Sequence, residues 1–312
     1  MTAPRIAVLV PCYNEEAAIA TVVRDFQKAL PSAAIYVYDN NSRDRTAEIA
    51  RAAGAIVRHE PRKGKGNVVR RMFADVEADI YILVDGDDTY DASAAPMLVK
   101  RLIEDGCDIV SGRRVATAED AYRAGHVLGN KLLTGLTALM FRVKLLDMLS
   151  GYRVMSRRFV KSFPFTASGF AIETELTVHA VRMLVPMLEI DTRYKERPVG
   201  SVSKLNTWGD GFRILFTIAA LVREERPLTF FGTIFAALFL LSVLFGTPVV
   251  IEYLHTGLVP RLPTAVLSTG LMLLAFLSLA SGLILDTVTR GRWEAKRNSY
   301  LSMPGPQDLT AP

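Results

Sequence analysis

Two stretches near the C-terminus of this 312-residue chain contain no charged residue, and they restrict its fold more than any other feature. One covers the 25 residues between Arg226 and Glu252, and the other the 24 residues between Arg261 and Asp286. A helix of about 24 residues is about 36 Å long, whereas the hydrocarbon core of a bilayer is about 30 Å thick. Each stretch is therefore long enough to cross a membrane. The alternative is a pair of buried core helices, but such helices rarely run this far without a charge.

The short loop between the two stretches predicts a helical hairpin whose two ends lie on one side of the membrane. Basic residues flank these ends: Arg223, Arg226, Arg290, Arg292, Lys296 and Arg297. The basic residues of the connecting loop are Arg261 and His255. Since Lys and Arg concentrate on the cytoplasmic side of membrane helices, we expect the N-terminal part and the C-terminal tail in the cytoplasm. The first apolar run, Ile6–Val10, is too short for a signal peptide, so we expect a multi-pass protein of the cytoplasmic (inner) membrane.

Composition excludes several other classes of protein. The two cysteines, Cys12 and Cys107, cannot form a disulfide framework, and the four histidines show no zinc-binding spacing. A net charge of +5 is too small for binding to nucleic acid by charge alone. This charge suits anionic substrates or an anionic lipid surface.

The N-terminal part alternates short strands with helices. We predict strands over residues 6–10, 35–39, 55–58, 80–84 and 108–111, and helices over 17–30, 44–53, 67–76 and 97–104, the second helix being capped by Ser42. Such alternation predicts an α/β fold with right-handed crossovers and a mostly parallel sheet. Ligands of these sheets bind beyond the carboxyl ends of the strands, here after Val10, Tyr38 and Val84.

The sharpest local signal follows the fourth predicted strand, where the sequence reads Asp85-Gly86-Asp87-Asp88. Three carboxylates in four residues repel one another, so a cation should offset them. Oxygen ligands favour Mg²⁺ or Mn²⁺ over zinc, and Gly86 allows Asp85 and Asp87 to face one ion. Such an ion would stabilise a diphosphate leaving group. The alternative is an acidic turn that is simply solvated.

Polar residues also follow the first and second predicted strands. Asn14 and Glu15 can bind a ligand, or can serve as a helix cap and first-turn acid. Asp39, at the start of Asp-Asn-Asn-Ser, can accept hydrogen bonds from a ribose hydroxyl or a base N–H, or can take part in an ordinary turn. The segment 62–66, Arg-Lys-Gly-Lys-Gly, is either a clamp for phosphate oxygens at a helix start or an exposed loop. The dinucleotide and P-loop glycine patterns are both missing, which argues against a dehydrogenase or an ATPase.

Taken in order, these motifs resemble those of family 2 glycosyltransferases with the Rossmann-like GT-A fold. The motifs are Val10–Glu15, Asp39–Asp44, Asp85–Asp87, Asp147–Arg153, Gly169–Glu175, Arg197 and Ser203–Leu205. The chain is most similar to polyprenyl-phosphate glycosyltransferases of the dolichyl-phosphate mannose synthase type. The resemblance covers residues 5 to 230, and the two C-terminal stretches match the bacterial subgroup with two transmembrane helices.

The resemblance implies a role for particular residues. Those expected at the donor nucleotide are Pro11, Tyr13, Glu15, Asp39, Lys65, Asp85 and Gly86. Asp85 and Asp87 should bind Mg²⁺ or Mn²⁺. Those expected at the acceptor phosphate are Arg113, Ser150, Arg153, Arg197 and Lys204. The expected catalytic residues are Asp87, Ser150, Arg153 and Glu173, where Glu173 is either a base or sugar contact or a helix N-terminal charge.

Two departures from the usual family pattern bear on the substrate. The second motif reads Asp-Asn-Asn where many relatives read Asp-Asp-Gly, which can alter contacts with the base or ribose. After the metal motif the chain reads Asp-Thr-Tyr-Asp rather than the more frequent Gln or Ser with a proline run, which leaves the identity of the sugar open.

The resemblance implies an inverting enzyme that moves one sugar from a UDP- or GDP-linked donor, with UDP-glucose as the default, to a polyprenyl (undecaprenyl-type) monophosphate. The product is a lipid-linked sugar at the cytoplasmic membrane face. A phosphate monoester, with a second pKa of about 6, is largely ionised near neutral pH and needs no strong general base. The resemblance also suggests a homo-oligomer, a tetramer, and the small net charge argues against a nucleic-acid partner.

Two other functions remain open from the sequence. A processive polysaccharide synthase usually carries Gln-x-x-Arg-Trp, but here Thr289 stands where that glutamine would be. A membrane-anchored nucleotide-sugar sensor without turnover is the second alternative. For the domains we expect a catalytic domain over 1–204, a juxtamembrane amphipathic helix over 205–226, spans over 227–252 and 262–286, and a cytoplasmic tail over 287–312. A packed core helix is the alternative for the juxtamembrane segment.

Overall fold

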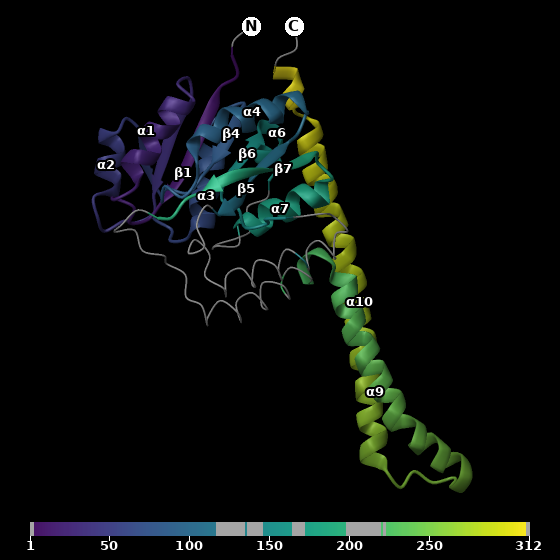
Figure 1. Cartoon of the computed structure of the whole chain (residues 1–312). Coiled ribbons are helices and arrows are strands. Elements are labelled where there is room, and N and C mark those ends of the chain that lie inside the picture. The colour runs from purple at the N-terminus through teal and green to yellow at the C-terminus, as the bar shows by residue number, and fades with distance from the viewer. Residues whose placement is uncertain are drawn as a thin grey trace. The chain divides into compact units, whose positions relative to one another are not determined.

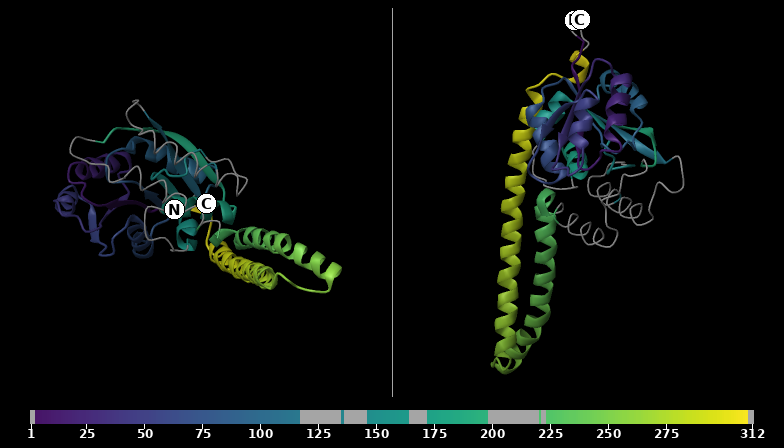
Figure 2. Two further views of the ribbon diagram at one scale, coloured as in Figure 1. Left: turned by 90° about the horizontal axis from the view of Figure 1, so that it is seen from below. Right: turned by 90° about the vertical axis from the view of Figure 1, so that its left-hand side faces the viewer.

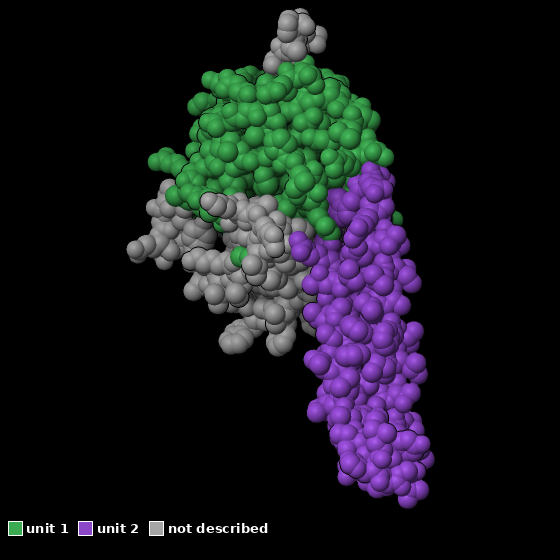
Figure 3. All heavy atoms as spheres, turned by 90° about the vertical axis from the view of Figure 1, so that its right-hand side faces the viewer, with its two compact units in different colours: residues 1–211, 296–312 green, residues 212–295 purple. Residues whose placement is uncertain are grey.

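The computed structural model describes residues 3–116, 135, 146–163, 172–197, 220 and 223–309. The chain divides into two compact units, which Figure 3 colours separately. Unit 1 comprises Met1–Gly211 and Lys296–Pro312, and unit 2 comprises Phe212–Ala295. Unit 2 is thus an insertion between two parts of unit 1.

Unit 1 is built on a mixed sheet with seven strands in the described part of the chain (Figure 1). The strands are β1 (Ile6–Cys12), β2 (Ala34–Asp39), β3 (Ile56–His59), β4 (Ile80–Leu83), β5 (Ile109–Ala116), β6 (Arg153–Ser156) and β7 (Met187–Tyr194). Their order is β3-β2-β1-β4-β6-β5-β7. All neighbours pair in parallel except β6, which is antiparallel to both β4 and β5. The predicted mostly parallel sheet is therefore confirmed.

Successive residues of β1 point to opposite faces of the sheet and so enter two separate cores. Val8 and Val10 lie in one core with α1 (Ile19–Ala29), α2 (Thr46–Ala52) and α4 (Ala95–Glu104). Ala7 and Leu9 lie in the other with α3 (Lys65–Asp75), α6 (Arg157–Ser162) and α7 (Ile172–Met183). Because both faces are covered by helices, the central strands are apolar throughout, as is usual for parallel sheets.

The nine predicted strands and helices of the N-terminal part are confirmed within a few residues at each end, except that β5 runs on to Ala116. The predicted cap at Ser42 is wrong. Helix α2 starts after Arg45, and its N-cap makes no side-chain hydrogen bond. The hydroxyl of Ser42 instead accepts the N–H of Asn14 at 2.9 Å, which joins the loop after β1 to the loop after β2.

Unit 2 contains most of a helical hairpin formed by α9 (Pro227–Thr256) and α10 (Leu262–Leu301), which run side by side (Figures 1 and 2). Two serine hydroxyls form hydrogen bonds between the helices. Ser242 donates to the carbonyl of Ser268 at 2.7 Å, and Ser278 donates to that of Phe231 at 2.9 Å. Both helices are long and apolar enough to cross a membrane, by length and composition.

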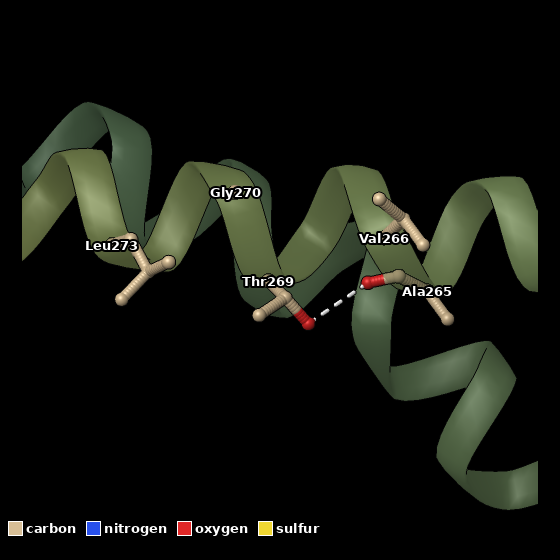
Figure 4. A pocket seen from close by; sticks show the side chains of 5 residues that line it. All are labelled: Ala265, Val266, Thr269, Gly270 and Leu273. Carbon is tan, nitrogen blue, oxygen red and sulfur yellow. Dashed lines mark hydrogen bonds between the residues drawn. The ribbon is translucent and has the colours of Figure 1, made fainter.

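Helix α10 carries an open pocket lined by Ala265, Val266, Thr269, Gly270 and Leu273, whose side chains Figure 4 shows. The hydroxyl of Thr269 donates to the carbonyl of Ala265 at 3.0 Å, within the same helix. An apolar helix surface whose hydroxyls are satisfied by its own backbone suits contact with lipid.

The last part of α10 and the short helix η3 (Pro306–Leu309) belong to unit 1. The hydroxyl of Tyr300 donates to the fully buried carboxylate of Asp108 at 2.6 Å. Arg158 donates to the same carboxylate at 2.6 and 2.8 Å, and its guanidinium lies 4.6 Å from the centre of the Tyr300 ring. The C-terminal segment is therefore part of the packing of unit 1.

Candidate active site

The loops that follow β1, β2 and β4 meet at one edge of the sheet. Register places Cys12 opposite Asp39, and the N–H of Asn40 donates to the carbonyl of Cys12 at 2.8 Å. On the other side of β1, the N–H of Val84 donates to the carbonyl of Leu9 at 3.1 Å. The three segments predicted to carry the chemistry are therefore neighbours, as expected for the carboxyl ends of parallel strands.

Two glycines bring the acidic turn after β4 close to its surroundings. A Cβ on Gly86 would lie 2.6 Å from the sulfur of Cys12. A Cβ on Gly151 would lie 2.5 Å from a carboxylate oxygen of Asp85. A Cβ at either position would displace its neighbour, so glycine allows the turn to approach Cys12 and allows Asp85 to approach residue 151.

Asp87 is 4% exposed and accepts hydrogen bonds from the hydroxyl of Thr89 at 2.6 Å and from its N–H at 3.3 Å. The guanidinium of Arg197 contacts Asp87 at 2.6 Å and comes within 4.0 Å of the carboxylate of Glu15. Burial, followed by the neighbouring charge of Asp85, raises the pKa of Asp87. The site thus holds a carboxylate whose ionised form is costly without a cation.

Lys65, the first residue of α3, joins this turn to the first turn of α7. Its ammonium forms ion pairs with both Asp85 and the buried carboxylate of Glu173. Burial alone would lower the pKa of this lysine, but the two carboxylates outweigh burial and raise it. Lys65 is therefore a fixed positive charge beside the acidic turn.

The structure brings Glu15, Lys65, Asp85, Asp87, Glu173 and Arg197 into two adjoining groups of opposite charges. These two groups together contain two cations, the ammonium of Lys65 and the guanidinium of Arg197, and four carboxylates. An anionic substrate can displace these carboxylates and bind to the same two cations. The arrangement is therefore suited to a diphosphate in company with a divalent cation.

The residues predicted for the nucleoside lie on the β1–β2 side of this edge. Both oxygens of Asp39 accept the N–H of Ser42 at 3.3 Å, and the Nδ1 of His59 lies 3.3 Å from one of them. Tyr13 is 39% exposed and Pro11 is half-buried at the end of β1. Asp39 therefore keeps accepting capacity at the end of β2, which suits hydrogen bonding to a base or ribose.

Ser150 and Arg153 lie inside the protein rather than at its surface. Arg153 is 1% exposed and donates to the carbonyl of Ser150 at 3.0 Å, to that of Met148 at 2.6 Å, and to the hydroxyl of Thr177 at 2.8 Å. The hydroxyl of Ser150 donates to the carbonyl of Gly112 at 2.5 Å. Burial lowers the pKa of Arg153. These contacts support the segment behind Asp85, and direct contact with an acceptor phosphate stays a prediction.

The other predicted acceptor residues lie apart from one another. Arg113 forms a two-pronged ion pair with Asp191 across β5 and β7, while Arg197 lies at the acidic turn. Lys204 lies outside the described residues. Arg113 and Arg197 therefore have different acidic partners in the described part of the chain.

Sequence reasoning missed two contributors to the site. Thr89 holds Asp87, and its position two residues after an aspartate is a recognisable turn signal. Lys195 reaches Asp88 at 3.3 Å from the end of β7, a strand that the sequence reading did not include. The second contact had no local signal, because it depends on long-range strand pairing.

A metal ion fits the acidic turn only as part of a larger complex. Among the described residues, no group of three or more His, Cys, Asp and Glu side chains is arranged as a metal site. Asp85 and Asp87 supply oxygen ligands, and Mg²⁺ or Mn²⁺ commonly takes one or two carboxylates together with substrate phosphates and waters. Burial and the charge of Asp85 raise the pKa of Asp87, and a bound cation would offset both effects.

Comparisons with known proteins identify the family. Residues 7–163 match the model of glycosyl transferase family 2. Protein RfbJ of Shigella flexneri is 58% identical over 122 residues, which cover 39% of this chain and 95% of RfbJ. Glycosyltransferase AglJ of Haloferax volcanii is 33% identical over 235 residues, which cover 75% of this chain and 77% of AglJ.

Two further similarities concern the reaction. A dolichyl-phosphate hexose transferase of Haloferax volcanii is 28% identical over 221 residues, covering 71% of this chain and 95% of that protein. The structure of glucosyl-3-phosphoglycerate synthase from Mycobacterium tuberculosis in complex with Mn²⁺ and UDP-glucose superposes with a TM-score of 0.56 and 25% identity, covering 70% of this chain and 78% of that one. Together with the sheet order, these comparisons confirm the predicted GT-A fold.

Proposed function

The chain belongs to glycosyl transferase family 2, and we propose that it moves one sugar from a nucleotide sugar to the monophosphate of a polyprenyl lipid. The observation that carries this proposal is the cluster of opposite charges at the carboxyl edge of the sheet, centred on Lys65, Asp85 and Asp87. The named activity of the dolichyl-phosphate hexose transferase supports the lipid acceptor. The two apolar helices support it as well, because they offer a surface for a long-chain lipid.

The donor binds at the edge where β1, β2 and β4 end. Asp39 and Tyr13 face the nucleoside, and Lys65 and Arg197 bind the diphosphate oxygens. Asp85 and Asp87 hold Mg²⁺ or Mn²⁺, which neutralises the leaving diphosphate when bound. UDP-glucose is the default donor, in keeping with the UDP-glucose and Mn²⁺ bound to the mycobacterial synthase.

The acceptor needs positioning more than activation. A lipid phosphate is already ionised at neutral pH, so one of its oxygens attacks the anomeric carbon without giving up a proton. A new bond forms between this oxygen and the carbon as the bond to the diphosphate oxygen breaks, and the configuration inverts. The fixed charge of Lys65 stabilises the departing diphosphate, and Glu173 holds Lys65 in place.

The membrane supplies the acceptor. Helices α9 and α10 span the cytoplasmic membrane. The basic residues just before α9 and in the last part of α10 keep unit 1 in the cytoplasm. The lipid then approaches from the bilayer, while the nucleotide sugar approaches from water. This division matches a reaction between a soluble donor and an insoluble acceptor.

The test is transfer by the purified full chain in detergent. The protein is incubated with Mn²⁺, polyprenyl phosphate and radiolabelled UDP-glucose, and then with other UDP- and GDP-linked sugars. We expect one lipid-linked sugar with one of the donors. A long polymer would identify a processive synthase, and tight donor binding without any transfer would identify a sensor. Either result would overturn the proposal.

A further inference from the structure

The basic turn, residues 60–64, leads directly into Lys65 and carries the exposed side chains of Arg62 and Lys63. Its backbone is held by the side chain of Asn40, which is 7% exposed. The side-chain nitrogen of Asn40 donates to the carbonyl of Glu60 at 2.9 Å and to that of Arg62 at 2.8 Å. Its side-chain oxygen accepts the N–H of Gly64 at 2.8 Å. One amide therefore joins the start, middle and end of the turn.

These contacts require an amide at position 40. An amide presents two N–H donors and one carbonyl acceptor, and both donors and the acceptor are used here. A carboxylate of the same shape would accept from Gly64 but would set an oxygen against the two carbonyl oxygens. Since the site is buried, such a mismatch costs more than a lost hydrogen bond at the surface.

The basic turn also fixes the position of Lys65. Gly64 has a φ of 117°, a backbone conformation that other residues avoid, and Lys65 follows it as the first residue of α3. Lys65 then reaches Asp85 and Glu173 with its ammonium. A shift of the turn moves the start of the helix and with it this charge.

We propose that Asn40 is a positioning residue for the transfer reaction, which holds the basic turn so that the ammonium of Lys65 lies beside the acidic turn. This inference rests on the proposed function only in assigning Lys65 to the diphosphate. Asn41 reinforces the same turn with weaker contacts, from its side-chain nitrogen to the carbonyls of Glu60 at 3.2 Å and Pro61 at 3.1 Å. The pair of asparagines after β2 is thereby explained by the turn that it secures.

The test is the isosteric change Asn40→Asp, with Asn67→Asp as the matched control. Asn67 lies in the first turn of α3, and its side-chain nitrogen donates to the carbonyl of Lys63 at 2.9 Å at the protein surface. The control adds the same negative charge close to Lys65 but opposes one exposed carbonyl of the turn, that of Lys63, instead of the two carbonyls that a buried side chain holds. The two variants therefore separate loss of positioning from added charge.

Two readouts are compared. Trypsin cleavage after Arg62 and Lys63 reports opening of the basic turn, independently of any reaction. We expect Asn40→Asp to speed this cleavage by about fivefold or more and to raise the KM for the nucleotide sugar by about tenfold, with the KM for lipid phosphate changed by less than about twofold. Asn67→Asp should stay within about twofold of the wild type in all three.

The result that overturns the inference is an Asn40→Asp protein with wild-type cleavage and wild-type donor KM. An equal rise in both KM values, with a lowered melting temperature, would indicate general loss of structure and would also overturn it. If the wild-type chain shows no transfer with any donor, the proposed function fails instead. The cleavage comparison then still decides whether Asn40 holds the turn.

Discussion

At the scale of single residues, Asp87 combines burial with a nearby like charge. Its raised pKa means that the folded protein favours the protonated form more than the unfolded chain does, so the ionised carboxylate destabilises the fold at neutral pH. Its contact with Arg197 offsets only part of this cost. A residue retained at a cost in stability is expected where it binds a ligand.

We therefore predict that Asp87→Asn abolishes transfer without lowering the melting temperature. The amide removes a buried charge, keeps the shape and loses the ability to hold a divalent cation. Transfer assays and thermal unfolding of the same preparation check both parts. A variant that still transfers sugar, or that melts well below the wild type, would contradict the role given to Asp87.

Arg153 leads to the opposite prediction. Its guanidinium is buried and donates to two carbonyls and a hydroxyl, so Arg153→Ala leaves these acceptors unsatisfied and opens a cavity. We expect the free energy of unfolding to fall by about 3 kcal/mol. Arg113→Ala, which removes an exposed cross-strand ion pair, should change it by less than about 0.5 kcal/mol.

Chemical denaturation of unit 1 distinguishes the two arginine variants. Equal losses of stability would show that the burial of Arg153 is not what matters. The sequence placed both arginines in one group because both are cations near recognisable motifs. It could not separate them, since the burial of Arg153 depends on the insertion of β6 between β4 and β5.

At the scale of elements, the sequence predicted the strands and helices that are marked by the pattern of their own residues. The apolar runs of β1 and β4 and the amphipathic pattern of α1 mark those elements, because burial in the fold requires apolar residues at these positions. Strand β6 is four residues long, antiparallel, and paired with strands far away in the chain. Its existence depends on its partners, so no window of sequence reveals it.

The entry into α3 gives an element-scale prediction. Gly64, with its φ of 117°, allows the basic turn to pass into the helix, and an alanine there is strained. We expect Gly64→Ala to lower the free energy of unfolding by about 1 to 2 kcal/mol. The same change at Gly291, inside α10 with nothing near its added methyl, should be neutral or stabilising.

Thermal unfolding and donor binding measured side by side check this prediction. Gly64→Ala should weaken donor binding as well, because Lys65 follows directly. A Gly64→Ala protein as stable as the wild type would show that the turn can relax into another conformation.

At the scale of the whole molecule, the chain returns to unit 1 after the hairpin. The hydroxyl of Tyr300 donates a hydrogen bond to the buried carboxylate of Asp108. This carboxylate also accepts hydrogen bonds from Arg158 and from the hydroxyl of Ser156, each at 2.6 Å. We predict that Tyr300→Phe costs about 1 to 2 kcal/mol of stability in unit 1. The ring stays, so its stacking with Arg158 is retained.

The control for this prediction is Tyr253→Phe on α9, where the side chain is 52% exposed. It should leave the unfolding of unit 1 unchanged. Faster proteolysis of the C-terminal segment in Tyr300→Phe alone would support the docking contact. Identical behaviour of the two variants would show that the hydroxyl contributes nothing.

The packing of the C-terminal segment on unit 1 also determines how a water-soluble version can be engineered. A gene cut just before α9 would lose Tyr300 and η3, which pack on Asp108 and α4, and would leave a buried carboxylate without one of its partners. A better design replaces the hairpin by a flexible linker and keeps residues 296–309. Alternatively, the missing piece can be added back as a synthetic peptide, whose binding to the truncated protein would make a split-protein reporter of correct folding.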